Sequence, residues 1–559
     1  MNNLRFAYCI AVLFSMLANV GIAQTKSPFN EGSEPFNLNT GSSFTASGGS
    51  ADSNSRHSAI SAEILEAEEI IRRHHIDGRK IEIKDLTRST INGALRTLDP
   101  HSNYFDPAEW KEMLEDERSG YTGIGASIAN FERGGRSATY ILATFPGSAA
   151  LKGKLKFGDK IVAVNGTNVL GKASDFVRNK LRGPDGTSLK VTVEHSATNR
   201  LETVELRRGR VPQPSIPDSY ILRPGIGYIS LTEGFNFTTN DEFDAALKML
   251  HRQGMTSLIV DLRGNGGGIV EQAVKVASKF LPAGTVILTQ RGRSRIDNRV
   301  WRSENPKPET LPLVLLVDEN TASASEIVAG ALQDCDRALI VGNKTFGKGL
   351  VQSVLDLPSG SGLTLTSARY LTPTGRSIQR DYSRIGLYDY FRHTTPAADI
   401  SKPYFEARTP TDRKVLGGDG IMPDELIEQP ELSLDQIALL DPIFFFIRDM
   451  ANGRVNIASA ENLNASEAGN LTVQNNAGLV AAFAGFLKLH PEFKITKTAL
   501  AAEKDFIDLR LRHDLSMATN GSNAATHTLL EDDLQAAKAV ELLPQAAQLA
   551  QLAAKTRKQ

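Results

Sequence analysis

The stretch from Leu311 to Ser353 places the strongest constraint on how this chain can fold. Residues 313–317, LVLLV, form an apolar run with the length and composition of a fully buried strand. A polar turn follows, and apolar residues then return at helical spacing with Ile327, Val328, Ala331 and Leu332. The stretch therefore predicts a buried strand that leads through a short turn into a helix.

Small hydroxyl residues lie at this strand-to-helix turn, in residues 321–325, TASAS. The first N–H groups of a helix have no intrahelical acceptor, so they can stabilise an oxyanion formed when a hydroxyl attacks a carbonyl. Further along, Lys348 stands between glycines and beside Leu350 and Val351. Desolvation at such a place would lower the pKa of the lysine toward that of a general base.

The glycine and lysine pair also suggests a phosphate-binding loop, because residues 342–348, GNKTFGK, match G-x-x-x-x-G-K. Such a loop needs Ser or Thr next, and it opens a helix. Here Gly349 comes next, and the following LVQSVLDL has the character of a strand. The pattern therefore disfavours nucleotide binding.

The positions of the histidines bear on which residue could act as the general base. None occurs between His251 and His393, and the chain has no G-x-S-x-G pattern. A distant histidine could still complete a triad, but its local absence favours a lysine base. Gln352 follows Lys348 by four residues, so its amide oxygen could return to a similar side and orient the lysine amine.

Two neighbours of the hydroxyl turn have simpler explanations. Ser325 at the helix start is explained by capping. Glu326 in the first turn is explained by the helix dipole, and its charge would favour the protonated lysine, which opposes the mechanism.

The segment before this stretch alternates strands and helices. Residues 227–231 and 257–262 read as strands and 239–252 as an amphipathic helix, and the turn RGNGGG at 263–268 opens a helix over 269–281. This alternation predicts an α/β layer with some parallel strands. The glycine turn exposes backbone N–H groups that could hold a phosphate or a developing oxyanion.

Residues 120–210 change to short β runs with glycine turns. The block FGDKIVAVNG at 157–166 resembles PDZ domains of bacterial proteases. The resemblance implies that the C-terminal strand of a substrate adds to the edge of this domain. It also implies that backbone N–H groups hold the carboxylate, here those of Gly123, Ile124, Gly125 and Ala126. The alternative is a β-domain used only for packing.

Five motifs together are similar to the C-terminal processing peptidases, serine proteases of the tail-specific type: DLRGNGGG, TASASEIVAGALQD, GNKTFGKGLVQ, LTPTGRSI and GIMPD. With the PDZ-like segment, the similarity covers about residues 60 to 430. It implies that Ser323 is the nucleophile, Lys348 the general base and Gln352 the residue that orients the lysine. It also implies an oxyanion hole built from the backbone N–H groups of Ala324 and of one glycine, Gly266 or Gly267.

The N-terminus reads as a secretory signal peptide, with an apolar run followed by small residues and cleavage after Ala23. We therefore expect an exported, periplasmic protein, soluble or peripherally associated with the membrane. Cleavage leaves Cys335 alone, so stability must come from the cores. A formal net charge of −1 gives no support for nucleic-acid binding.

The sequence thus predicts a multidomain α/β protein: a signal peptide over 1–23, a flexible linker over 24–56, a helical N-terminal domain over 57–118, a PDZ domain over 119–210, a serine protease core over 211–428 and a helical C-terminal domain over 429–559. In the last, Leu529, Leu530, Leu534 and Ala537 indicate an apolar face for a cap or for homo-oligomerisation.

Two functions stay open at this point. One is a periplasmic serine endopeptidase that recognises protein C-termini, with no cofactor and no metal. The other is a proteolytically silent PDZ scaffold that binds protein tails.

Overall fold

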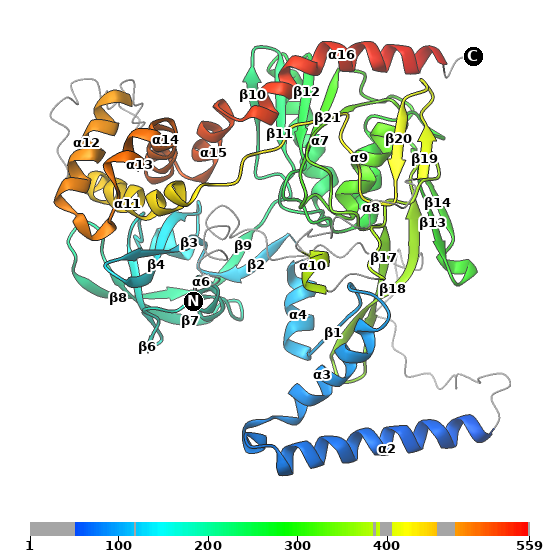
Figure 1. The fold of residues 1–559 in the computed structure, drawn as a ribbon, viewed down its shortest axis with the longest axis horizontal. Coiled ribbons are helices and arrows are strands. Elements are labelled where there is room, and N and C mark those ends of the chain that lie inside the picture. Colours follow the sequence, from blue (N-terminus) through cyan, green and yellow to red (C-terminus); the bar gives the residue numbers. More distant parts are fainter. Residues whose placement is uncertain (1–50, 117–118, 384–386, 392–404, 455–475, 557–559) are drawn as a thin grey trace.

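The computed structural model describes residues 51–116, 119–383, 387–391, 405–454 and 476–556. Two lobes lie side by side, and a pair of N-terminal helices projects from one of them (Figure 1). The predicted signal peptide, residues 24–50 of the predicted linker and the cleavage site lie outside the described residues. No helix in the described part of the chain is long and apolar enough to cross a membrane.

The core lobe is built on a six-stranded sheet in which β11 to β21 run parallel and β10 pairs antiparallel at one edge. The predicted α/β layer with parallel strands is therefore confirmed. In spatial order its strands are β10 (Asp218–Arg223), β11 (Ile226–Ser230), β12 (Ser257–Asp261), β15 (Leu313–Val317), β16 (Leu339–Gly342) and β21 (Glu425–Leu426).

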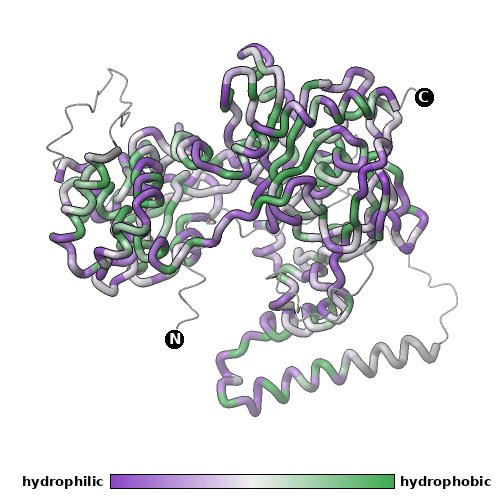
Figure 2. The backbone as a smooth tube through the Cα atoms, turned by 45° about the horizontal axis from the view of Figure 1, so that its top comes forward, coloured by the Kyte–Doolittle hydropathy of each residue, from purple (hydrophilic) through white to green (hydrophobic). Residues whose placement is uncertain are grey.

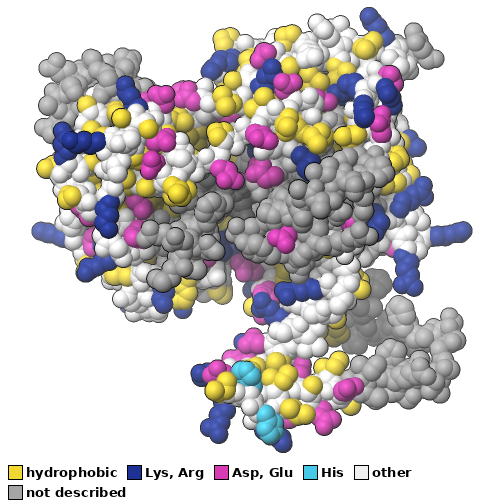
Figure 3. Space-filling model, viewed as in Figure 1, with side chains coloured by type: hydrophobic (Ala, Val, Ile, Leu, Met, Phe, Trp, Pro, Cys, Tyr) yellow, Lys and Arg dark blue, Asp and Glu magenta, His cyan; other side chains and the backbone are white. Residues whose placement is uncertain are grey.

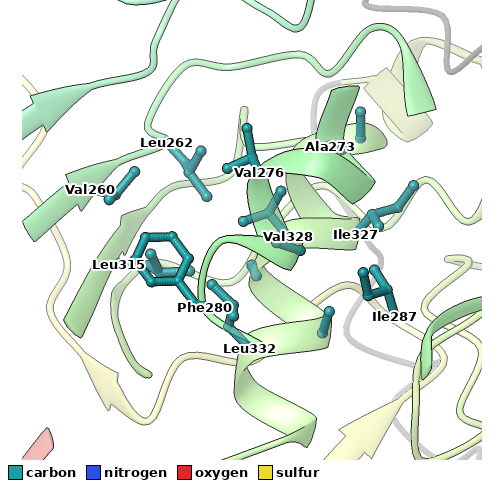
Figure 4. Close-up of a cluster of buried hydrophobic side chains, with 14 of the residues drawn as sticks. Val260, Leu262, Ala273, Val276, Phe280, Ile287, Leu315, Ile327, Val328 and Leu332 are labelled. Carbon is teal, nitrogen blue, oxygen red and sulfur yellow. The ribbon is translucent and has the colours of Figure 1, made fainter. Parts of the chain in front are cut away.

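Three helices cover one face of this sheet: α7 (Thr239–Arg252), α8 (Val270–Ser278) and α9 (Ala324–Asp334). Alternate strand residues such as Val260 and Leu315 meet Val276, Val328 and other apolar side chains of α8 and α9 (Figure 4). Hydrophobic residues concentrate along these central elements (Figure 2). Because every residue of α9 is buried, the position of its first turn is fixed from all sides.

The other face of the sheet is covered by α16 (Leu534–Thr556), near the end of the chain. Strand residues such as Ile259 and Leu316 pack there against Ala539 and Leu543. The predicted apolar face is wrong in part, since Leu534 is exposed. Part of the predicted C-terminal domain is thus a layer of the core.

A second sheet holds β17 (Leu350–Asp356) and β18 (Gly362–Leu371), which also pairs with β13 (Val286–Gly292); β13 in turn pairs with β14 (Arg299–Arg302). Its remaining strand, β1 (Asn103–Phe105), comes from the N-terminal region and pairs with β18. The region predicted as a helical N-terminal domain therefore supplies a strand to the core lobe.

That region otherwise contains α2 (Ala51–His74), α3 (Ile83–Arg96) and α4 (Pro107–Asp116). The linker predicted for 24–56 differs from the structure at its end, because α2 begins at Ala51. Helix α2 projects from the body and carries exposed apolar side chains, including Leu65 and Ile70 (Figure 3).

The second lobe contains the segment predicted as a PDZ domain. Its sheet has the order β3-β4-β5-β7-β8, with β6 beside β5, so β3 is an edge strand. The bounds are β3 (Ala126–Arg133), β4 (Arg136–Thr144), β5 (Lys160–Val164), β6 (Thr167–Asn168), β7 (Ser188–Glu194) and β8 (Leu201–Arg207), with helices α5 (Ala149–Lys152) and α6 (Ser174–Leu181). Its two connections to the core pair with each other as β2 (Gly120–Gly123) and β9 (Gly209–Pro212).

Helices α11 (Leu434–Ala451) and α14 (Lys504–Asn520) pack on the β3–β4 face of this domain, and α12 (Asn476–Leu489) and α13 (Lys497–Ala502) pack on these two helices. Phe444 of α11 stacks on Phe131 of β3 with ring centroids 3.6 Å apart. Helix α15 (Ser522–Glu531) then leads to α16 on the core. The C-terminal helices therefore contact both lobes.

Candidate active site

Ser323, the predicted nucleophile, lies between β15 and α9 with φ 59° and ψ −116°. A non-glycine residue rarely adopts positive φ, and such strain concentrates at functional turns. The side chain is buried, and among the described residues its Oγ has no hydrogen-bond partner. The turn therefore resembles the strained nucleophile turn of serine hydrolases, although the G-x-S-x-G pattern is absent.

Lys348, the predicted base, lies two residues before the start of β17 and is 1% exposed. Burial lowers its pKa to about 7, while the nearby carboxylates of Glu326 and Asp99 oppose that shift. A substantial fraction of this lysine is then neutral at pH 7, as a general base requires.

Glu326 joins the two segments that carry these residues. One carboxylate oxygen, Oε2, accepts hydrogen bonds from the backbone N–H groups of Ser323 at 2.8 Å and Lys348 at 2.9 Å. The other, Oε1, accepts from the Thr345 hydroxyl at 2.6 Å and the Gly347 N–H at 2.8 Å. The helix dipole alone is therefore an incomplete explanation of Glu326. Burial raises the pKa of this carboxyl, and its four hydrogen-bond donors offset that rise only in part.

Tyr370 of β18 also contacts both segments. Its buried hydroxyl lies 2.9 Å from the carbonyl oxygen of Ser323 and 2.8 Å from that of Lys348. The backbones of the predicted nucleophile and base are thus held together by one carboxylate and one phenol, and residues 323 and 348 cannot separate without breaking these contacts.

Gln352, the predicted orienting residue, is buried in β17 opposite Thr366 of β18. Its Nε2 donates to the Thr366 hydroxyl at 3.3 Å. Among the described residues its Oε1 has no hydrogen-bond partner, so it can accept from an amine.

The predicted glycine turn lies against the first turn of α9. A Cβ on Gly267 would come within 2.7 Å of Ser323 Cβ and 2.9 Å of the Ala324 nitrogen. The Gly267 N–H already donates to Asn265 Oδ1 at 2.9 Å, which leaves Gly266 as the better candidate for an oxyanion donor beside Ala324. Ser325 also bonds to this glycine turn: its hydroxyl donates to the Asn265 carbonyl at 2.9 Å. The interpretation of Ser325 as a helix cap is therefore wrong.

A loop that the sequence interpretation missed also borders the site. Residues 99–102 follow α3, and Asp99, His101 and Ser102 are all buried. Burial, together with the positive charges of Lys348 and Arg380, lowers the pKa of His101 to about 2. His101 Nε2 lies 2.9 Å from the Tyr390 hydroxyl. Because its pKa is lowered further than that of Lys348, His101 is the weaker base of the two. The only signal for this loop in the sequence is the three polar residues beside Pro100.

The four residues predicted to hold a carboxylate lie at the start of β3. Gly123 ends β2, Gly125 has φ 72°, and Ala126 begins β3. The carbonyls of Ile124 and Gly125 accept from the domain itself, at Ala150 N and Phe145 N.

The open edge of β3 is partly covered. The N–H of Glu132 donates to Asp441 of α11 at 3.0 Å. Alternate residues of a strand face the same edge, so the N–H groups of Ile128 and Asn130 also point there. Burial raises the pKa of Asp441 to about 6.

No group of three His, Cys, Asp or Glu side chains in the described ranges is placed to hold a metal ion. The buried Cys335 caps α9 at its far end, away from the first turn.

Comparison with known proteins bears on these observations. The family model described as Peptidase family S41 matches residues 225–385, and the PDZ domain model matches residues 113–194. The carboxy-terminal-processing protease of Bartonella bacilliformis is 32% identical over 301 residues, which cover 53% of this chain and 67% of that protein. This chain belongs to the carboxyl-terminal-processing peptidases of family S41.

A chloroplastic member, carboxyl-terminal-processing peptidase 1 of Arabidopsis thaliana, is 33% identical over 322 residues, which cover 55% of this chain and 65% of that peptidase. The chain thus spans just under two thirds of that relative. Among solved structures, the photosystem II D1 C-terminal processing protease is 28% identical, with a TM-score of 0.35, over 65% of this chain and 92% of that chain. The S41 match contains the β15–α9 turn, Lys348 and Gln352, and the PDZ match contains Gly123 to Ala126.

Proposed function

We propose that this S41 family member is an active serine endopeptidase with Ser323 as nucleophile, Lys348 as general base and Gln352 as the residue that orients the lysine. The observation that carries the proposal is the burial of Lys348, which brings its pKa to about 7 while Glu326 holds its backbone beside that of Ser323.

In the proposed mechanism the neutral amine of Lys348 takes the hydroxyl proton of Ser323 as Oγ attacks a peptide carbonyl. The oxyanion that forms lies at the start of α9, where the N–H groups of Ala324 and Gly266 stabilise it by roughly 3–4 kcal/mol for each well-placed donor. The lysine ammonium then protonates the leaving amine. Water activated by the same lysine hydrolyses the acyl-enzyme and regenerates Ser323.

The PDZ domain would deliver the substrate. A protein tail adds as a strand along the edge of β3, using the N–H groups of Ile128 and Asn130, while the loop from Gly123 to Ala126 holds its carboxylate. Binding of one peptide with a free carboxylate and of the same peptide with a C-terminal amide tests this role. We expect at least tenfold weaker binding of the amide, and equal binding would remove the carboxylate assignment.

We further propose that the protein is exported to the periplasm through the signal peptide over residues 1–23, and that association between copies involves its N- or C-terminal helices. Fractionation of cells that produce the full chain tests the first proposal, and light scattering of residues 24–559 tests the second.

The test of the chemistry compares residues 24–559 with the variants Ser323→Ala, Lys348→Ala and Gln352→Ala on a reduced, alkylated protein substrate. We expect cleavage by the parent chain, none by the first two variants and a reduced kcat for the third. Lys344→Ala is the matched lysine control, because Lys344 lies four residues away and pairs with Asp419 at the surface. Turnover by Lys348→Ala would exclude the lysine base, and tail binding without cleavage by the parent would favour the scaffold.

A further inference from the structure

The loop of residues 99–102 lies against the same strand pair that carries Gln352. It leads into β1, which pairs with β18, and β18 pairs with β17 with Thr366 opposite Gln352. Asp99 and Ser102 are 6% and 2% exposed. Most buried polar side chains are hydrogen-bonded, so the partners of these two residues indicate what the loop does.

Those partners form a chain that ends at Gln352. Asp99 Oδ1 accepts the N–H groups of His101 and Ser102, each at 2.8 Å, and Asp99 Oδ2 accepts the Ser102 hydroxyl at 2.7 Å. Ser102 Oγ in turn accepts the Thr366 N–H at 3.1 Å and lies 3.5 Å from the Thr366 hydroxyl. The Thr366 hydroxyl oxygen accepts from Gln352 Nε2 at 3.3 Å.

The Asp99 carboxylate sets the donor and acceptor roles along this chain of hydrogen bonds. A carboxylate can only accept hydrogen bonds, so Ser102 must donate its single hydroxyl proton to Asp99. Ser102 Oγ is then an acceptor toward Thr366, and the Thr366 oxygen is left as an acceptor for an amide NH₂ group. Gln352 must therefore turn its Nε2 toward Thr366 and leave its Oε1 directed away, which is the oxygen without a partner among the described residues.

We propose that Asp99 and Ser102, supplied by the N-terminal region, are positioning residues that fix the amide orientation of Gln352 through Thr366. The inference rests on the proposed function, in which this oxygen of Gln352 orients the Lys348 amine during the reaction. It extends the active site to a segment upstream of the PDZ domain, outside the residues matched by the S41 model.

The variant Asp99→Asn tests the direction of the chain. An asparagine can keep its oxygen on the two backbone N–H groups and present an NH₂ group to Ser102. The Ser102 hydroxyl then donates to the Thr366 hydroxyl, and the Thr366 hydroxyl donates to Gln352. The Gln352 amide must then rotate so that its oxygen faces Thr366. We expect kcat to fall about tenfold with little change in KM, as for loss of an interaction made in the transition state.

Two further variants break the chain elsewhere. Ser102→Ala removes its middle, and Thr366→Val removes the hydroxyl that contacts Gln352 while keeping the backbone N–H. We expect a similar loss of kcat in both, and no additional loss when either is combined with Gln352→Ala. Ser353→Ala is the matched control, because its hydroxyl bonds Ser367 across the same two strands, at 2.8 Å, outside the chain.

The pH profile separates positioning from a structural effect. The carboxylates of Glu326 on α9 and Asp99 in the loop raise the pKa of Lys348, and the charge of Lys348 in turn lowers the pKa of His101. Asp99→Asn removes a negative charge that raises the pKa of Lys348, so its acidic limb of kcat should move to lower pH. Thr366→Val removes no charge, and its limb should move less than that of Asp99→Asn.

The assays use residues 24–559, with circular dichroism and thermal unfolding to establish that each variant is folded. If Ser102→Ala fails to fold, Thr366→Val carries the test, since it leaves the loop intact. Parent-level kcat and an unshifted limb in folded Asp99→Asn and Thr366→Val would overturn the inference while leaving the Ser–Lys proposal standing. Cleavage that survives in Ser323→Ala would overturn the proposed function itself.

Discussion

Glu326 and Lys348 are joined by a hydrogen bond of 2.9 Å from the backbone N–H of the lysine to the carboxylate of the glutamate. The carboxylate thus touches the main chain of the lysine, and its charge also raises the pKa of the side chain. Glu326 positions the proposed base while opposing the neutral form that a lysine base needs. Desolvation of Lys348 is the larger effect, because the pKa still falls to about 7.

Replacing Glu326 with Gln should destabilise the fold and lower activity. The glutamine NH₂ group would face backbone or hydroxyl donors, and each stranded buried donor costs roughly 1–3 kcal/mol. Urea unfolding and kcat/KM measure the two effects. Glu271→Gln, at an exposed site on α8, is the control and should change neither quantity appreciably.

The pH dependence of cleavage should report the titration of Lys348. Because the neutral amine is the active form, kcat/KM should rise with pH through about 7 and fall roughly tenfold per pH unit well below it. A profile from pH 5 to 9 on an uncharged peptide substrate measures this. A kcat/KM that stays constant from pH 5 to 9 would contradict the assignment of Lys348 as base.

Replacing Lys348 with Met should abolish cleavage and stabilise the fold at neutral pH. The folded state holds the lysine pKa near 7, against an ordinary value of 10.5, so the unfolded chain binds more protons between these two values. Parent stability therefore rises with pH across that window, by roughly 1.4 kcal/mol per pH unit at most. The advantage of Lys348→Met should be full below pH 7 and disappear toward pH 10.5; a constant difference would show that the lysine is charged in the fold.

Replacing Gly267 with Ala should remove activity. The new Cβ would lie 2.7 Å from Ser323 Cβ and 2.9 Å from the Ala324 nitrogen, so the turn must move at the proposed oxyanion site. Loss of one oxyanion donor costs roughly 100- to 1,000-fold in kcat. Gly375→Ala is the matched control: Gly375 also has positive φ, 82°, but a Cβ there meets nothing within 4 Å, so it should cost stability without comparable loss of kcat.

Replacing Phe444 with Ala should loosen the C-terminal helices from the PDZ domain. The ring stacks on Phe131 and lies within 5.1 Å of the Tyr140 centroid, and loss of such a buried ring costs roughly 3–5 kcal/mol. Hydrogen exchange at β3 and β4 should become faster. Phe405→Ala, at an exposed site, is the control. Unchanged protection of β3 in Phe444→Ala would mean that the helices do not hold this face.

The residues of the strand, turn and helix around Ser323 could be predicted because their pattern is local. Apolar periodicity predicts β15 and α9, and the residue types around Lys348 predict its desolvation. The role of Glu326 could not be predicted, since three of its four partners come from residues 345–348, whose position depends on the tertiary fold. Asp99 and Ser102 were missed for the same reason, because 264 residues separate Ser102 from Thr366.

The helices near the end of the chain show a second limit. A helical C-terminal domain follows from composition and spacing. Which surface its helices cover depends on partners far away in sequence. The face predicted from Leu530 and Leu534 is therefore only partly right, because the sheet lies against Ala536, Ala539 and Leu543.

The position of α16 has a consequence for how the protein is made. Every strand of the main six-stranded sheet precedes α16 in the chain. The ribosome therefore synthesises the whole sheet before the helix that covers its second face. Until then Ile259, Val314 and Leu316 face solvent, and the sheet lacks one of its two layers. The core lobe therefore keeps one face of its main sheet uncovered until α16 has been synthesised and packs on it.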